Sequence, residues 1–219
     1  MIFIVLFSDH TTISSNNSFD GALLVDLQKF ESKKPTPSKD EAKKQLIHLL
    51  QMAHSGEKAA ANAYYGHYKS WFIKNSTERA EVKKIYEDEL HHRQRLKEIL
   101  AELGAKPKLR LEIMFFSIGF TIGFLCLFGG WFIPMYGAGK LESTNIAEYE
   151  VAARLAHLAG LNKYIPELLV FAEIEWDHEL YFRNKAESHF LYKLFPKWTI
   201  PKERKLISVD MNTYQSKFS

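Results

Sequence analysis

Residues 89–92 read ELHH and residues 175–178 read EWDH, so the pattern Glu-x-x-His occurs twice in the chain. Positions three apart lie on one face of an α-helix, so the carboxylate and the imidazole of each pair point the same way. Two such pairs prove little by themselves, because a chain with nine His residues can contain one by chance. Their position within the helices is more informative.

Both pairs interrupt the apolar face of a predicted helix. Apolar residues at helical spacing stand on either side of each pair: Val82, Ile85, Leu96, Ile99 and Leu103 around the first, and Leu168, Phe171, Ala172 and Phe182 around the second. A carboxylate in a core stripe is costly unless it is paired or bound to a metal ion. These pairs are therefore candidate metal ligands.

Two more carboxylates are needed to complete a known arrangement. Ferritin-like di-metal proteins take one Glu from each of two helices and a Glu-x-x-His from each of the other two, all pointing inward. Glu57 lies in the apolar stripe of the first predicted helix. The third helix offers Glu148 and Glu150, which the helical pattern does not separate; Glu150, on the face of Ile146 and Ala153, is preferred.

The sequence thus predicts an all-α fold, a ferritin-like four-helix bundle, with one set of residues as both metal ligands and catalytic residues: Glu57, Glu89, His92, Glu150, Glu175 and His178. Four carboxylates balance two divalent ions, and mixed oxygen and imidazole ligands favour two iron ions, with manganese as the alternative. The competing interpretation makes each residue a surface ion-pair partner or a buried histidine. The ordered set on four helices argues against it.

Three further residues are candidates for lining the site or supporting its ligands. Tyr64 could line a substrate path, with core packing as the alternative. His67 could hydrogen-bond a ligand, or could be exposed or cap a helix. His157 faces the predicted site from the third helix and could equally be a core residue.

Capping signals predict the domain organisation. Ser38 and Glu41 form a capping box that begins the first core helix, which should run to about residue 73. The other core helices are predicted at about 77–104, 143–160 and 166–190. Gly137 and Gly139 are predicted to interrupt helical structure before the third core helix. Residues 1–37 are an N-terminal extension and linker, 38–190 the di-metal domain and 191–219 a C-terminal tail.

A hydrophobic insert is predicted at 111–136, between the second and third core helices. Residues 114–136 carry no charged side chain and are long enough to cross a bilayer. Glycines, a proline and aromatic residues favour instead a helical hairpin or amphipathic segment lying in one leaflet. Its membrane-facing residues are predicted to be Phe120, Phe124, Phe128 and Trp131. The apolar start, residues 1–7, is a poor signal peptide.

Composition excludes several classes of protein. The chain has 219 residues, enough for one domain with a full core, and a net charge of +3, too small to predict nucleic-acid binding. Its single cysteine, Cys126, excludes an intrachain disulfide framework and makes a reducing compartment the default.

The chain resembles the demethoxyubiquinone hydroxylase family, which are ferritin-like di-iron monooxygenases of ubiquinone synthesis. The stretch GEKAAANAYYG at 56–66 is similar to the family's G-E-x6-Y-x-G element. Four further features match the family over about residues 40–190: the spacing from Glu89 to Lys106-Pro107, the GFTIG stretch at 119–123, Gly139-Lys140 and the second Glu-x-x-His. Two positions depart from it: His67 replaces a common Gln, and His157 stands seven residues after Glu150 where the family has Tyr.

The resemblance implies a di-iron, oxygen-dependent hydroxylase acting on a membrane quinone precursor, with the six ligands given above. It implies a hydrophobic quinone-type substrate, dioxygen, an unidentified electron donor and a membrane surface as partners; a homo-oligomer is compatible with it. The protein would then be peripheral or monotopic on the inner face of the cytoplasmic or an equivalent membrane.

Other functions fit the same ligand set. A ferritin-like metal-handling protein, acting as a ferroxidase, an iron store or a peroxide scavenger, is the main alternative, because the fold alone does not give the function. The apolar insert argues against a soluble storage cage. A tRNA-modifying hydroxylase is disfavoured by the small net charge, and an inactive membrane-associated helical protein would lack iron.

Overall fold

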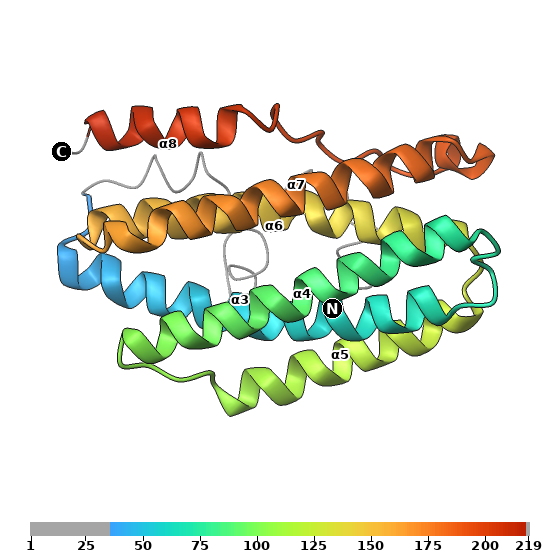
Figure 1. Cartoon of the computed structure of the whole chain (residues 1–219), viewed down its shortest axis with the longest axis horizontal. Helices are drawn as coiled ribbons and strands as arrows, with labels where there is room; N and C mark the ends of the chain where they lie inside the picture. Colours follow the sequence, from blue (N-terminus) through green and yellow to red (C-terminus); the bar gives the residue numbers. More distant parts are fainter. Residues whose placement is uncertain (1–35, 218–219) are drawn as a thin grey trace, which may run out of the picture. The chain divides into compact units, whose positions relative to one another are not determined.

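The computed structural model describes residues 36–217. The apolar stretch at 1–7 lies outside the described residues, and so does the predicted extension at 1–37 except for its last two residues. Within residues 36–217 the regular structure is entirely helical and contains no strand. This confirms the all-α prediction, and the helix order is that of a ferritin-like helical bundle with an added apolar helix (Figure 1).

Four long helices correspond to the predicted core helices: α3 (Lys39–Lys69), α4 (Ser76–Glu102), α6 (Phe132–Leu158) and α7 (Ile165–Glu187). The apolar helix α5 (Leu109–Phe128) stands between α4 and α6 in the chain. Short 3-10 helices at Asn162–Tyr164 (η1) and Phe190–Leu194 (η2) and the C-terminal helix α8 (Leu206–Lys217) complete the described chain.

The predicted capping signals hold in the structure. The Glu41 amide donates to Ser38 Oγ at 3.3 Å, and Asn75 Oδ1 accepts from the Thr77 and Glu78 amides at 2.8 and 3.2 Å. Gly104 and Gly160 follow α4 and α6 with φ of 75° and 72°, the left-handed conformation expected just beyond a helix end.

The largest difference concerns the start of the third core helix, which was predicted near 143–145. α6 begins at Phe132 and continues through Gly137 and Gly139. Gly139 allows the Trp198 ring to pack closely on α6, because a Cβ at this position would lie 2.8 Å from the ring. The prediction of a glycine break was therefore wrong, and α6 carries an extra ten residues before Glu142.

Three smaller predictions also change. The first helix, predicted to run to about residue 73, ends at Lys69, and Trp71 beyond it is 73% exposed. The tail contains a helix, α8, which packs on α7. The insert predicted at 111–136 contains most of α5, a turn at Gly129 and Gly130, and the first residues of α6.

The described chain forms two compact units, which are treated separately. One runs to Leu46 and resumes at Gly137, and it holds α7, α8 and most of α6. The other is Ile47–Tyr136, with most of α3 and all of α4 and α5. The long helices α3 and α6 each continue from one unit into the other.

Within Ile47–Tyr136, α5 packs against α3 at backbone-to-backbone distance. A Cβ added at Gly66 of α3 would overlap the Gly123 carbonyl oxygen, and one added at Gly119 would overlap the Ala59 carbonyl oxygen. Only glycine permits so close an approach of two helices. The small face of α5 is therefore the face that binds it to α3.

A polar cluster around Glu112 joins α3, α4 and α5 within this unit. The Glu112 carboxylate accepts from Arg93 Nη2 at 2.7 Å and Ser55 Oγ at 2.8 Å, and it contacts His54 Nδ1 at 2.8 Å. Lys58 Nζ lies 3.4 Å away. Burial alone would raise the pKa of Glu112, but the hydrogen bonds from Arg93 and Ser55 outweigh it and lower the pKa to about 2.

The other unit is held by a second buried carboxylate. Glu179 of α7 accepts from Trp198 Nε1 at 2.9 Å and from Arg183 Nε at 2.9 Å. Trp198 also packs against Gly139 of α6. Glu179 therefore fixes the chain after η2 against α6 and α7.

The close approach of α3 and α5 gives a matched pair of glycine substitutions on one helix. We expect Gly66→Ala to lower the stability by about 2–3 kcal/mol, because two backbones must separate. Gly56→Ala, with no atom within 4 Å of the added Cβ, should be neutral or slightly stabilising. Thermal unfolding followed by circular dichroism measures both. Equal melting temperatures would contradict this packing.

The lowered pKa of Glu112 predicts a pH-dependent contribution to stability. A carboxyl whose folded pKa is depressed stabilises the fold above its unfolded pKa and loses that contribution as the pH falls towards the folded value. The stability difference between the metal-free wild type and Glu112→Gln should thus be largest near neutral pH. It should vanish as the pH falls from 4.5, the ordinary pKa of a glutamate, to about 2. A difference that does not change with pH would rule out this role for the carboxylate.

Candidate metal centre

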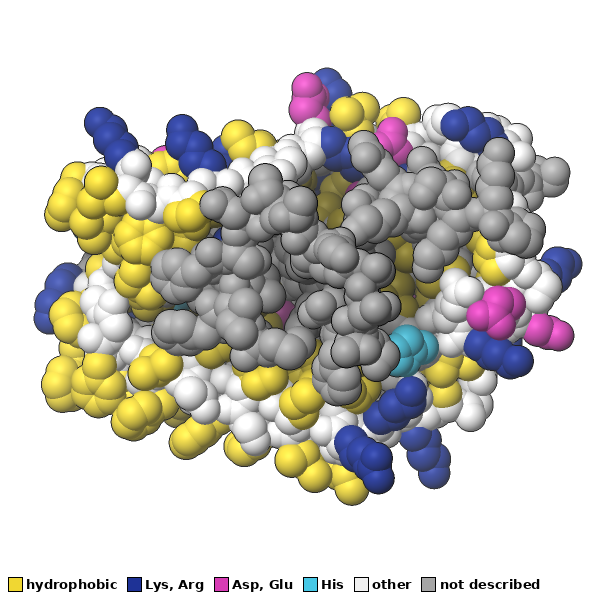
Figure 2. All heavy atoms as spheres, turned by 180° about the vertical axis from the view of Figure 1, so that it is seen from behind, with side chains coloured by type: hydrophobic (Ala, Val, Ile, Leu, Met, Phe, Trp, Pro, Cys, Tyr) yellow, Lys and Arg dark blue, Asp and Glu magenta, His cyan; other side chains and the backbone are white. Residues whose placement is uncertain are grey.

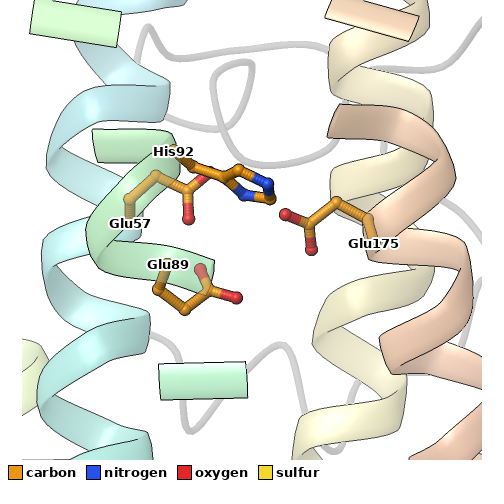
Figure 3. A group of neighbouring side chains, drawn as sticks. All are labelled: Glu57, Glu89, His92 and Glu175. Carbon is orange, nitrogen blue, oxygen red and sulfur yellow. The ribbon is translucent and has the colours of Figure 1, made fainter. Parts of the chain in front are cut away.

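Three predicted ligands come together within Ile47–Tyr136. Glu57 is on α3, and Glu89 and His92 are on α4. Each offers one ligand atom, and these atoms lie within 4.8 Å of one another. In Figure 3 the two carboxylates and the imidazole extend to the same side of α3 and α4. We call these residues the α3–α4 trio.

The α3–α4 trio is withdrawn from solvent. All three side chains are buried, and Glu89 and His92 have no exposed surface at all. His92 Nδ1 lies 3.9 Å from Glu57 Oε1, too far for a good hydrogen bond and close enough for both atoms to bind one ion. Two carboxylates and one imidazole in a buried site carry about −2 charges, which one divalent cation would balance.

A second trio forms within the unit that contains α6 and α7. Glu142 of α6 and Glu175 and His178 of α7 also offer ligand atoms within 4.8 Å of one another, and all three are buried. His178 Nδ1 lies 3.9 Å from Glu175 Oε2. We call these residues the α6–α7 trio. It repeats the composition of the first, two carboxylates and one imidazole.

An amide connects the two carboxylates of the α6–α7 trio. Asn145 Nδ2 donates to Glu142 Oε2 at 2.9 Å and to Glu175 Oε2 at 3.4 Å. Asn145 lies one turn after Glu142 on α6, so the helix itself places the amide between the two side chains.

Glu150, the predicted ligand on the third helix, has a different environment. It is buried, but its carboxylate forms an ion pair with Lys202, which also binds Asp210 Oδ2 at 2.5 Å. Burial raises the pKa of Glu150, and Lys202 acts in the opposite direction. Glu148, the alternative left open by the sequence, is half-buried. The structure brings neither of them into the α6–α7 trio, whereas it brings in Glu142.

Glu142 was missed because the third helix was predicted to begin after it. With α6 starting at Phe132, Glu142 shares a buried face with Ile146, Tyr149 and Ala153, at spacings of four, three and four residues. This apolar stripe was the sequence signal that could have identified Glu142 as a candidate ligand. Tyr149 also stands seven residues after Glu142, whereas the residue seven positions after Glu150 is His157.

The three weaker site candidates are not brought to the trios. His67 lies ten residues after Glu57 on α3, about 15 Å along the helix axis, and burial lowers its pKa to about 3. Tyr64 is buried two turns from Glu57. His157, near the end of α6, contacts Asn162 Oδ1 at 3.2 Å and the Tyr214 ring.

The predicted membrane-facing residues divide into two groups. Phe120, Phe124 and Phe128 of α5 are each more than half exposed. Trp131 is half-buried, and its Nε1 donates to Glu78 Oε2 at 3.1 Å, so it belongs to the turn before α6. Among the described residues, α5 is the one helix that is long and apolar enough to cross a membrane. Core helices of soluble proteins can have the same length and composition.

The donor set of each trio fits a divalent transition metal. Oxygen and imidazole ligands together suit iron or manganese, and calcium would take oxygen ligands alone. Burial of carboxylates without a cation would be costly. The buried Glu and His groups of this chain can therefore bind metal, and each trio has the composition of one half of a ferritin-like di-metal centre.

Comparison with known proteins gives one finding. Residues 44–189 match the family model described as ubiquinone biosynthesis protein COQ7, and the matched region contains both trios and α5. No curated protein and no solved structure matches the chain.

The two environments of Glu142 and Glu150 predict opposite effects of the same substitution. Glu142→Gln should weaken metal binding by at least about tenfold, because a direct ligand is lost. Glu150→Gln should leave the metal content unchanged and lose only the ion pair with Lys202. Metal per chain is measured by mass spectrometry after dialysis. Loss of metal in the Glu150 variant alone would restore Glu150 as the ligand.

Proposed function

We propose, because this chain belongs to the COQ7 family of ubiquinone biosynthesis proteins, that it hydroxylates the aromatic ring of a membrane quinone precursor. Membership of the family places the chain in ubiquinone biosynthesis, a pathway whose lipid products suggest association with membranes. The observation that carries the finer proposal is the pair of buried trios, each with two carboxylates and one imidazole.

The proposed metal sites are the two trios. Glu57, Glu89 and His92 would hold one iron ion, and Glu142, Glu175 and His178 would hold the other. When bound, the two ions would supply the redox chemistry with dioxygen that inserts one oxygen atom into the ring. Manganese fits the same ligands.

The chain's own residues contribute position, charge and exclusion of water. Four buried carboxylates supply about −4 charges, which balance two divalent ions, and the burial of all six side chains keeps bulk water from the reacting atoms. Asn145 Nδ2 orients the Glu142 and Glu175 carboxylates through its two hydrogen bonds. An electron donor, not identified by the residues described, would supply the two electrons that, with two protons, reduce the second oxygen atom to water in each reaction.

The outer face of α5 supports a membrane location for the reaction. Its exposed large apolar residues follow helical spacing and form one continuous face: Leu109, Ile113, Phe116, Phe120, Phe124 and Phe128. Figure 2 shows hydrophobic side chains along its lower edge, where α5 lies in Figure 1. An apolar face of this kind can lie in one leaflet, and an isoprenoid tail then need not leave the lipid. We propose a peripheral or monotopic protein on the inner face of the membrane.

A bacterial strain that lacks its own quinone hydroxylase tests this function. We expect the wild-type chain to restore the finished quinone, measured by mass spectrometry as its ratio to the demethoxy precursor. Glu89→Ala should abolish the restoration, because a buried metal ligand is lost. Glu81→Ala, an exposed residue of the same helix, is the matched control and should behave as wild type.

A contrary result identifies the alternative. If the wild type fails although it is folded and loaded with iron, the proposed reaction is wrong. Oxidation of many iron ions per chain would then favour a ferroxidase or storage function.

A further inference from the structure

A cavity of about 380 Å³ opens on the unit Ile47–Tyr136, apart from the metal ligands. One wall is a single stripe of α4 at helical spacing, and the rest comes from α3, from the turn before α5 and from its first residues. The lining residues are Leu90, Arg93, Gln94 and Lys97 of α4, His54 of α3, Pro107, and Glu112 of α5. Its volume is within the range of small-molecule sites.

The charge around this cavity is positive. Arg93, Lys97 and the neighbouring Lys58 carry three positive charges against the one negative charge of Glu112. Lys106, Lys108 and Arg110, beside Pro107, are all exposed and add to the excess. Glu112 is occupied by Arg93, Ser55 and Lys58, and Lys97 makes no ion pair with any described residue. Lys97 therefore remains available to an anionic ligand, whereas Gln94 Nε2 already donates to Glu98 Oε1 at 2.8 Å.

Arg93 is held in place before any ligand arrives. Its Nη2 donates to Glu112 at 2.7 Å, and its Nη1 donates to the His54 carbonyl oxygen at 3.3 Å. A guanidinium fixed at two points loses little conformational entropy when a further acceptor approaches. The α4 wall thus presents one fixed and one mobile cation, Arg93 and Lys97, separated by one helical turn.

The cavity lies next to the apolar face of α5. Glu112, which lines the cavity, is within one helical turn of Leu109, Ile113 and Phe116, which are all exposed. Lys58 connects the two regions, because its Nζ lies 3.4 Å from Glu112 and 5.2 Å from the centre of the Phe116 ring. In Figure 2 dark-blue Lys and Arg side chains stand at one end of the lower row of hydrophobic side chains.

We infer that this cavity binds the phosphate headgroup of an anionic membrane lipid while the face of α5 contacts its acyl chains. The inference rests on the proposed membrane location of α5 and adds a defined headgroup site to it. Cationic side chains beside an apolar helix are the usual receptors of acidic lipid headgroups. A lipid is favoured over a free anion because the cationic wall and the exposed apolar residues meet at one opening.

Vesicle binding by the purified, metal-loaded full chain tests this site. Sedimentation would compare vesicles of phosphatidylcholine alone with vesicles containing about one third phosphatidylglycerol. We expect the wild type to bind both and to bind the acidic vesicles at least about tenfold more tightly. Lys97→Glu should remove most of that preference without reducing binding to neutral vesicles, and Lys97→Arg should keep it.

Lys84→Glu is the matched control. It makes the same change of charge on the same helix, about 20 Å along the axis from Lys97 and beyond the screening length of about 8 Å at physiological salt. Because both lysines are exposed, neither variant should unfold, and circular dichroism would verify this. Equal losses of acidic-vesicle binding in Lys84→Glu and Lys97→Glu would overturn the headgroup site.

Two further outcomes separate this inference from the membrane location. If the wild type binds neither kind of vesicle, the membrane location itself fails. If it binds both equally, the location stands and the headgroup site fails. Binding of inorganic phosphate by the wild type but not by Lys97→Glu, together with equal binding of the wild type to both kinds of vesicle, would assign the cavity to a free anion and also overturn the inference.

Discussion

The burial of carboxylates in helix cores is the constraint on which the rest of this structure depends. Glu57 and Glu89 lie beside His92 in one unit, and a matching trio lies in the other. A carboxylate removed from water destabilises the fold unless a cation or hydrogen-bond donors replace the lost hydration. Other carboxylates of residues 36–217 are paired with protein groups: Glu112 with Arg93 and Ser55, Glu179 with Trp198 and Arg183, and Glu150 with Lys202. Each trio combines two carboxylates with one imidazole, a donor set that suits a divalent metal ion.

Helix α5 connects this constraint to the proposed membrane surface. The glycine face of α5 contacts Ala59 and Gly66 of α3. Helix α3 also carries Glu57, two residues before Ala59. The opposite face of α5 presents phenylalanines outward. Because α5 packs on α3, a lipid surface that contacts the outer face of α5 would lie beside the helix that carries Glu57.

Much of the fold could be predicted because its signals are local. Ser38, Asn75, Gly104 and Pro166 each mark a helix end through hydrogen bonding or backbone conformation, and the structure uses all four. The start of α6 could not be predicted in this way, because Gly139 faces Trp198, a contact between residues far apart in the sequence. Because of this one error, Glu142 lay outside the predicted third helix, and the ligand on that helix was chosen between Glu148 and Glu150. The Glu112 cluster was not predicted either, since a carboxylate near an apolar segment gives no sign of its distant partners.

Iron titration of the purified chain, followed by Mössbauer spectroscopy of the iron-57-loaded protein, tests whether the two trios hold two metal ions. We expect two iron ions per chain, in sites of mixed oxygen and nitrogen ligation. A single iron per chain, or no iron retained by folded protein, would contradict the proposed metal sites.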